Sequence, residues 1–272
     1  MMSSNHKVTS GDASLNVQID GSDLLPWLVL SNSLATDLSM WDDQIELLTR
    51  THRVLRYDTR GHGKSSAPAG PYSFDLLVRD MVALMDHFHI ERADILGLSL
   101  GGMTALGLAL EHPARVGRLI CADARADNPP PFIEGWDHRI GIVREKGMAG
   151  IVGGTMERWF TSATREQRPE TIARASAMML ATSADGYIAS AQALKQLDYL
   201  RRLPQMKAPT LYIVGAEDGA APPDAMRAMA AATPGARFES IPNAAHIANM
   251  EDVGAFNALI TGFLGNERRA AE

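Results

Sequence analysis

The sequence predicts an α/β fold, with a mostly parallel central sheet flanked by helices on both faces. Short apolar runs of strand length alternate with amphipathic segments along most of the chain, as expected of parallel strands joined by helical crossovers. One central stretch lacks such runs and is expected to be a helical insertion. The chain has 272 residues, of which 46% are hydrophobic, so it is long enough for one large core plus a small insertion.

The expected strands are buried apolar runs bounded by turn residues. They are expected at residues 25–32, 53–58, 93–99, 118–123, 210–215 and 236–242. Residues 7–19 alternate loosely between apolar and polar side chains. That pattern is compatible with an antiparallel hairpin at one edge of the sheet.

Three helices are expected to cover the sheet. The first follows Ser73, a residue type that often caps helix N-termini. The second spans about residues 100–112 and ends before Pro113, which cannot continue a helix. The third lies near the C-terminus. Apolar residues recur at helical spacing in the first (Leu77, Met81, Leu84, Met85 and Phe88) and in the third (Val253, Phe256, Leu259, Ile260 and Phe263).

The central stretch at residues 125–205 is expected to form a helical cap. It begins with the run NPPP at residues 128–131 and is rich in Met, Ala and Arg, without a clear buried strand. The expected organisation is therefore one α/β core, built from residues 1–124 and 206–272, with the cap inserted between its two parts.

Composition and charge exclude several classes of function. The formal net charge is −6 and no basic run stands out, which argues against a nucleic-acid surface. No apolar stretch reaches the roughly 18 residues expected of a membrane helix, and the N-terminus lacks a signal-peptide core, so a cytoplasmic location is expected. Cys121 is the single cysteine and lies in an apolar run, so it is expected to be a buried structural thiol. A homo-oligomer is compatible with the sequence.

The pentapeptide Gly97-Leu98-Ser99-Leu100-Gly101 is the sharpest chemical signal in the sequence. It directly follows an expected buried strand and directly precedes an expected helix. In that context a tight strand-to-helix turn exposes the serine hydroxyl and strains its backbone. The helix N-terminus then points at the place where negative charge develops in acyl transfer. Ser99 is therefore the expected nucleophile, and the alternative is an ordinary glycine-flanked serine in a loop.

A serine hydroxyl needs a general base, and His246 is the expected one among the eight histidines. It lies between the last expected strand and the final helix, which respects the chain order nucleophile, acid, histidine. His62 precedes Ser99 and is interpreted as a turn residue. No metal site is expected, since His87 and His89 are two residues apart on an expected helix and do not share a face.

The acid that orients the histidine should follow a late strand. Asp218 comes soon after the expected strand at residues 210–215 and is favoured. Its role would be to hold the His246 tautomer and stabilise the imidazolium. Glu217 is adjacent to it, and Asp123 ends an earlier strand where some enzymes place the acid, so both remain alternatives.

Acyl transfer also needs N–H donors for the oxyanion of the transition state. One is expected to be the backbone N–H of Leu100, the residue after the nucleophile. The other is expected from the loop at residues 31–35, where the N–H of Leu34 is the preferred donor. Asn32 and Ser33 in this loop could instead be simple turn formers, and both interpretations can hold together.

The stretch RYDTRGHGKS at residues 56–65, followed by GLSLGG at residues 97–102, resembles the α/β-hydrolase superfamily. More narrowly, the chain is similar over nearly its whole length to the beta-ketoadipate enol-lactone hydrolases (3-oxoadipate enol-lactonases). The narrower resemblance is carried by residues 31–44, 56–63, 157–161 and 181–187. Related esterases and perhydrolases share several of these segments.

This resemblance implies the α/β-hydrolase fold and the hydrolysis of a small cyclic enol ester carrying carboxylate groups, in bacterial breakdown of aromatic compounds. It implies no cofactor, and a small-molecule ester or lactone as partner. The expected cap entrance at residues 122–128 departs from the family by being more charged, which bears on the exact substrate.

Other functions are compatible with the same residues. The alternatives are a general carboxylesterase or perhydrolase, a carbon–carbon bond hydrolase that uses the same three residues, and a non-catalytic binding protein on the same fold. A haloalkane dehalogenase or epoxide hydrolase is disfavoured, because those enzymes carry Asp at the position of Ser99.

Trp136, Arg139 and Trp159 in the expected cap are candidate substrate-binding residues. Each could equally be a core aromatic residue or a surface charge. Among the cap arginines (Arg125, Arg139, Arg144 and Arg158), Arg139 is favoured as the partner of a substrate carboxylate. It lies three residues after Trp136, so on a helix the two would share a face, and its planar guanidinium suits a carboxylate.

Overall fold

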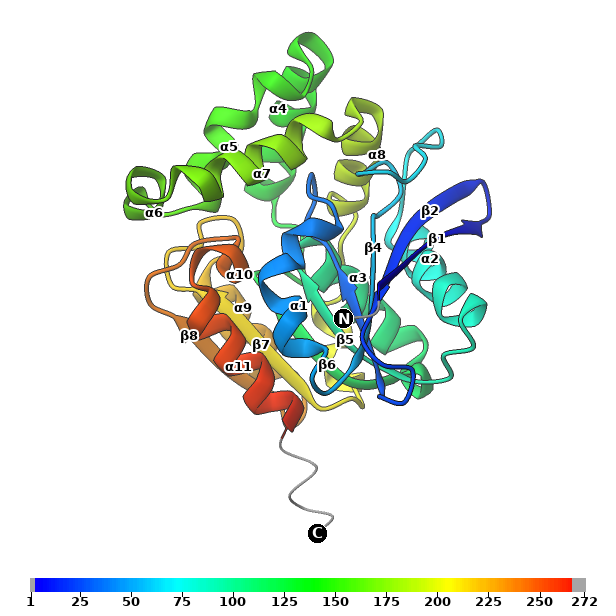
Figure 1. Cartoon of the computed structure of the whole chain (residues 1–272). Coiled ribbons are helices and arrows are strands. Elements are labelled where there is room, and N and C mark those ends of the chain that lie inside the picture. The colour runs from blue at the N-terminus through cyan, green and yellow to red at the C-terminus, as the bar shows by residue number, and fades with distance from the viewer. Residues whose placement is uncertain (1–2, 266–272) are drawn as a thin grey trace.

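The computed structural model describes residues 3–265, which are built around an eight-stranded sheet with the strand order β1-β2-β4-β3-β5-β6-β7-β8 (Figure 1). β1 (Ser3–Ser10) pairs antiparallel with β2 (Ala13–Asp20), and β2 pairs antiparallel with β4 (Arg53–Tyr57). The remaining neighbours pair in parallel: β3 (Trp27–Ser31), β5 (Ala93–Leu98), β6 (Val116–Ala122), β7 (Thr210–Gly215) and β8 (Arg237–Ile241). The predicted fold class is confirmed.

The predicted strands are all present: β7 has the predicted bounds, and the others differ by one or two residues at one or both ends. β6 begins at Val116, two residues before the expected start. The expected edge hairpin is longer than predicted, because its register extends from Ser10 opposite Ala13 to Ser3 opposite Asp20. Every residue of β5 and β7 is buried, as expected of central parallel strands that are covered on both faces.

Helices cover both faces of the sheet (Figure 1). On one face α1 (Asp42–Leu48) packs against α11 (Val253–Gly265), and on the other α2 (Phe74–His87) packs against α3 (Leu100–Glu111). α9 (Pro223–Ala232) contacts β7 and β8. As predicted, Ser73 caps α2, accepting the Leu76 N–H at 3.2 Å. α1 and α9 were not predicted: α1 has only seven residues, and α9 buries only two methionines in an alanine-rich stretch.

Between β6 and β7 the chain is helical, as expected, and these helices lie together at one end of the sheet (Figure 1). This is the end of the sheet at which β5 ends and Ser99 follows it. The division at residues 125 and 205 stays a prediction. The helices of this region are α4 (Pro130–Lys146), α5 (Val152–Trp159), α6 (Ser162–Gln167), α7 (Pro169–Ala181) and α8 (Ala184–Leu194), with the 3-10 turns η3 (Met148–Gly150) and η4 (Leu200–Gln205). The short helices outside it are η1 (Leu38–Trp41), η2 (Pro113–Arg115) and α10 (Ala248–Glu251).

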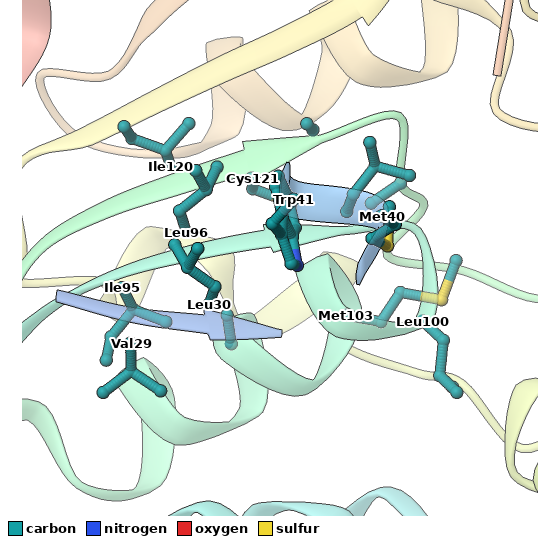
Figure 2. Packing of buried hydrophobic residues seen from close by; sticks show 14 of the residues in the cluster. Val29, Leu30, Met40, Trp41, Ile95, Leu96, Leu100, Met103, Ile120 and Cys121 are labelled. Carbon is teal, nitrogen blue, oxygen red and sulfur yellow. The ribbon is translucent and has the colours of Figure 1, made fainter. Parts of the chain in front are cut away.

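The hydrophobic core lies on both faces of the middle strands, and the loops of the site follow directly from these strands. Cys121 is fully buried, and burial raises the pKa of its thiol, so the expected structural thiol is confirmed. Among residues 3–265 no helix is both long and apolar enough to cross a bilayer. Figure 2 shows the packed side chains of β3 (Val29, Leu30), β5 (Ile95, Leu96) and β6 (Ile120, Cys121), with Met40 and Trp41 of η1 nearby.

Candidate active site

Ser99 lies in a tight turn between β5 and α3. Its backbone angles are φ 54° and ψ −116°, a region that costs a non-glycine residue about 1–3 kcal/mol. Such strain persists only where the surrounding structure fixes it, and it is a feature of sites that present a side chain. The turn leaves the Ser99 residue 8% exposed and places its hydroxyl above the carboxyl end of β5.

Two glycines make this turn sterically feasible. A Cβ on Gly97 would lie 2.3 Å from the carbonyl oxygen of Gly101, and one on Gly101 would lie 2.1 Å from the carbonyl oxygen of Ser31. Backbone atoms cannot move away from such contacts without moving β3 or α3. Glycine at both positions therefore lets α3 start directly above the sheet.

His246 joins Ser99 to Asp218 through two hydrogen bonds. Its Nε2 lies 2.9 Å from the Ser99 Oγ, and its Nδ1 lies 2.8 Å from an Asp218 carboxylate oxygen. The other Asp218 oxygen accepts the N–H groups of Ala220 and Ala221, at 2.7 and 2.9 Å. An ionised carboxylate can only accept, so Nδ1 carries the imidazole proton and Nε2 is left to accept the proton of the serine hydroxyl.

The topology explains why residues so distant in sequence meet. β5, β7 and β8 are parallel, so their carboxyl ends lie at one edge of the sheet. Ser99 follows β5, Asp218 follows β7, and His246 lies in the loop between β8 and α10. The three side chains therefore converge from three separate loops.

The alternative residues are placed differently. Glu217 is exposed, and it makes no hydrogen bond to His246 in the described part of the chain. Asp123 is fully buried and accepts the N–H of Gly215 at 2.8 Å. Burial and the charge of Asp218 raise the pKa of Asp123. His62 is also buried, bonded to the carbonyl of Arg60 at 3.0 Å, and burial lowers its pKa to about 4.

Two backbone N–H groups, those of Leu34 and Leu100, were predicted to bind an oxyanion. Within residues 3–265 neither the N–H of Leu34 nor that of Leu100 donates a hydrogen bond. The Leu100 N–H is the first of α3, and Leu34 lines the same cavity as Ser99. Asn32 is more than a turn former, because its amide donates to the Tyr57 carbonyl at 2.7 Å and accepts from the Trp41 indole at 2.8 Å, which fixes the loop.

A cavity of about 320 Å³ opens over Ser99 and His246. All three predicted substrate-binding residues, Trp136, Arg139 and Trp159, line it. Its walls come from both the sheet loops and the helices between β6 and β7. The volume suits a small-molecule substrate.

The cavity wall is cationic. The Arg139 guanidinium carbon lies 3.7 Å from the centroid of the Trp136 ring, so the two residues share a face of α4 as expected. Burial lowers the pKa of Arg139 to about 10, and the charge of nearby Arg158 acts in the same direction. Neither arginine pairs with a carboxylate among the described residues, and the Nε of Arg139 is buried without a hydrogen-bond partner. By contrast, Arg125 pairs with Asp127 at 2.7 Å.

Further residues line the cavity, among them Tyr187, which was not predicted, and Arg158, which was one of the four cap arginines considered but not the favoured one. Arg158 and Tyr187 join Arg139 in the wall, and burial raises the pKa of Tyr187 to about 12. Both lie in or beside segments that carry the enol-lactonase resemblance, which was the available signal. Arg144, another arginine of α4, is exposed and does not line the cavity.

The chain is similar to known hydrolases over almost its whole length. The family model for the alpha/beta hydrolase fold matches residues 26–253. The chain is 36% identical to 3-oxoadipate enol-lactonase 2 of Acinetobacter baylyi, over 92% of both sequences. The structure of an enol-lactonase from Burkholderia xenovorans LB400 has a TM-score of 0.92 at 38% identity, covering 96% of this chain and 100% of that one. A hydrolase from Pseudomonas aeruginosa PA01 has a TM-score of 0.92 at 40% identity, covering 96% and 98%.

Proposed function

The chain belongs to the α/β-hydrolase family and is an ester or lactone hydrolase, and we propose that it uses Ser99 as a nucleophile to open an anionic enol-lactone such as 3-oxoadipate enol-lactone. The observation that carries this proposal is the hydrogen-bonded chain from Ser99 through His246 to Asp218, at 2.9 and 2.8 Å, on the floor of a cationic cavity.

The reaction begins with attack of the Ser99 Oγ on the lactone carbonyl. Nε2 of His246 takes the hydroxyl proton, and Asp218 stabilises the resulting imidazolium through Nδ1. The N–H groups of Leu34 and Leu100 donate to the oxygen that becomes negative. When the tetrahedral intermediate collapses, the ring C–O bond breaks and the enol oxygen leaves with the proton from His246.

The ring-opened acyl group then remains as an ester of Ser99. A water molecule, deprotonated by His246, attacks this ester and releases the carboxylic acid, and the serine recovers its proton. The released enol tautomerises to a ketone. These steps need no redox partner, because no atom changes its oxidation state by electron exchange with another molecule.

The cavity wall supports an anionic substrate. Two guanidinium groups, Arg139 and Arg158, line a cavity with the aromatic residues Trp136 and Trp159, and neither has a carboxylate partner within residues 3–265. A carboxylate that enters this cavity loses water and needs a charged hydrogen bond in return. Arg139, whose guanidinium lies over the Trp136 ring, is the group that we propose meets it, and residues 125–205 act as the cap that provides this wall.

A substrate panel tests the proposal. We expect kcat/KM for 3-oxoadipate enol-lactone to exceed that for p-nitrophenyl acetate and for a vinylogous diketone, the substrate type of carbon–carbon bond hydrolases. Ser99→Ala should lose all of these activities. Preference for the neutral ester would point instead to a general carboxylesterase, and preference for the diketone to a carbon–carbon bond hydrolase.

A further inference from the structure

Glu251 is a buried carboxylate that connects the loop of His246 to the cap. It ends α10 and is 5% exposed. One of its oxygens accepts the N–H of Ala245, the residue before His246, at 2.6 Å. The other accepts both the N–H and the hydroxyl of Thr161, each at 2.7 Å. Thr161 lies between α5 and α6, so a single side chain holds two distant segments.

Further bonds tie the same two segments together. The N–H of Ile247 donates to the carbonyl of Trp159 at 3.2 Å. Arg168 Nη1 donates to the main-chain carbonyl of Glu251 at 2.6 Å. Residues 159–161 of the cap therefore run beside residues 245–247, with His246 in the middle. Since Trp159 also lines the cavity, one wall of the pocket is fixed to the loop of the base.

The buried environment of Glu251 means that its carboxylate needs both of the segments that it connects. A buried carboxylate is stable only where hydrogen bonds replace its water. Among the described residues Glu251 has no salt-bridge partner, and its three donors come from Thr161 and Ala245. Both donor residues are themselves buried. The carboxylate is satisfied only when the cap segment and the loop of His246 are both in place.

We propose that Glu251 is a positioning residue, which sets the place of His246 by fastening its loop to cap residues 159–161. The inference rests on the proposed function, in which His246 is the general base. His246 must reach Ser99 and Asp218 at once, and small displacements of a catalytic group lower turnover strongly. Within residues 3–265, Glu251 does not line the cavity and makes no hydrogen bond to the side chain of Ser99, His246 or Asp218.

The test is Glu251→Gln, which keeps the shape of the side chain. The amide of glutamine has one acceptor oxygen, so it can accept from Thr161 or from Ala245 but not from both. Its NH2 group then faces the remaining donor, and that hydrogen bond is lost. We expect kcat for p-nitrophenyl acetate, expressed per site titrated with a fluorophosphonate, to fall about tenfold or more with KM within about threefold. A merely structural role would lower the melting temperature and the titratable fraction but leave kcat per titrated site unchanged, and that result overturns the proposal.

A second pair of variants decides the matter if Glu251→Gln does not fold. Thr161→Val removes one donor to Glu251, and Thr161→Ser retains it. We expect kcat per titrated site to fall about threefold in Thr161→Val and to be restored in Thr161→Ser. Equal values for Thr161→Val and the wild type contradict the proposal. The part of the proposed function on which this inference depends is catalysis by Ser99 and His246. Its failure is distinguishable, because the wild-type protein would then have no site that the fluorophosphonate titrates.

Discussion

Replacing Arg139 with Ala should weaken hydrolysis of an anionic lactone and spare a small neutral ester. Arg139 lines the cavity with Ser99 and His246, and its guanidinium has no carboxylate partner in the described part of the chain. The substrate carboxylate is expected to fill that role. Without Arg139 the carboxylate would enter the cavity and lose water with less compensation.

The magnitude follows from the kind of bond that is lost. A hydrogen bond between charged groups contributes about 1.5–3 kcal/mol, which corresponds to about ten- to hundredfold in kcat/KM. The truncation also removes packing, since the guanidinium carbon lies 3.7 Å from the centroid of the Trp136 ring. Arg139→Lys separates the two contributions, because lysine keeps the charge but not the planar fork. We expect it to lie between wild type and Arg139→Ala.

The assay compares kcat/KM for 3-oxoadipate enol-lactone and for p-nitrophenyl acetate in the same preparations. Arg144→Ala is the matched control, because Arg144 lies exposed on the same helix, α4. We expect the control to match wild type with both substrates. If both activities of Arg139→Ala fall together, Arg139 is structural. If neither falls, the carboxylate is bound elsewhere or the substrate is not anionic, and the reasoning is refuted.

Three further predictions concern single residues. Asp218→Asn should lower kcat far more than Glu217→Gln or Asp123→Asn, because only Asp218 accepts from His246; an equal loss at Asp123 would assign the acid to that residue. Gly101→Ala should lower the free energy of unfolding in urea by about 2 kcal/mol or more, since its Cβ would meet the Ser31 carbonyl at 2.1 Å; wild-type stability would contradict this. The folded state raises the pKa of Asp123, so the native protein binds this proton more tightly than the unfolded chain. Protonated Asp123 therefore stabilises the folded state at low pH. This stabilisation is lost as pH rises above about 4, the ordinary pKa of Asp in the unfolded chain. Asp123→Asn should therefore gain stability relative to wild type between about pH 4 and pH 7, and a constant difference in urea titrations would refute this.

The strand-to-helix turn and the order of the late loops could be predicted because both are local or topological. Gly97, Ser99 and Gly101 lie within five residues, and the close contact at Gly97 is with α3 itself, although the contact at Gly101 is with Ser31 of β3. His246 and Asp218 follow the last two strands. Parallel strands bring their carboxyl ends to one edge, so the meeting of these residues follows once the strands are recognised.

The cap could not be predicted to the same depth. Arg158 and Tyr187 meet Arg139 only because of the way in which α4, α5 and α8 are arranged around the cavity. Helical periodicity shows which face of a helix is buried, but it does not show which other helix that face packs against. Glu251 escaped notice for a related reason. Two of its three donors are the backbone N–H groups of Thr161 and Ala245, and backbone donors leave no signal in the residue types.

The most direct test of the central claim is to find where a fluorophosphonate reacts. The protein is incubated with the probe, digested, and mapped by mass spectrometry. We predict one phosphonyl adduct per chain on Ser99, no adduct in Ser99→Ala, and strongly slowed labelling in His246→Ala, because the base activates the hydroxyl. An adduct on another residue, or retained lactone hydrolysis by Ser99→Ala, would contradict the account.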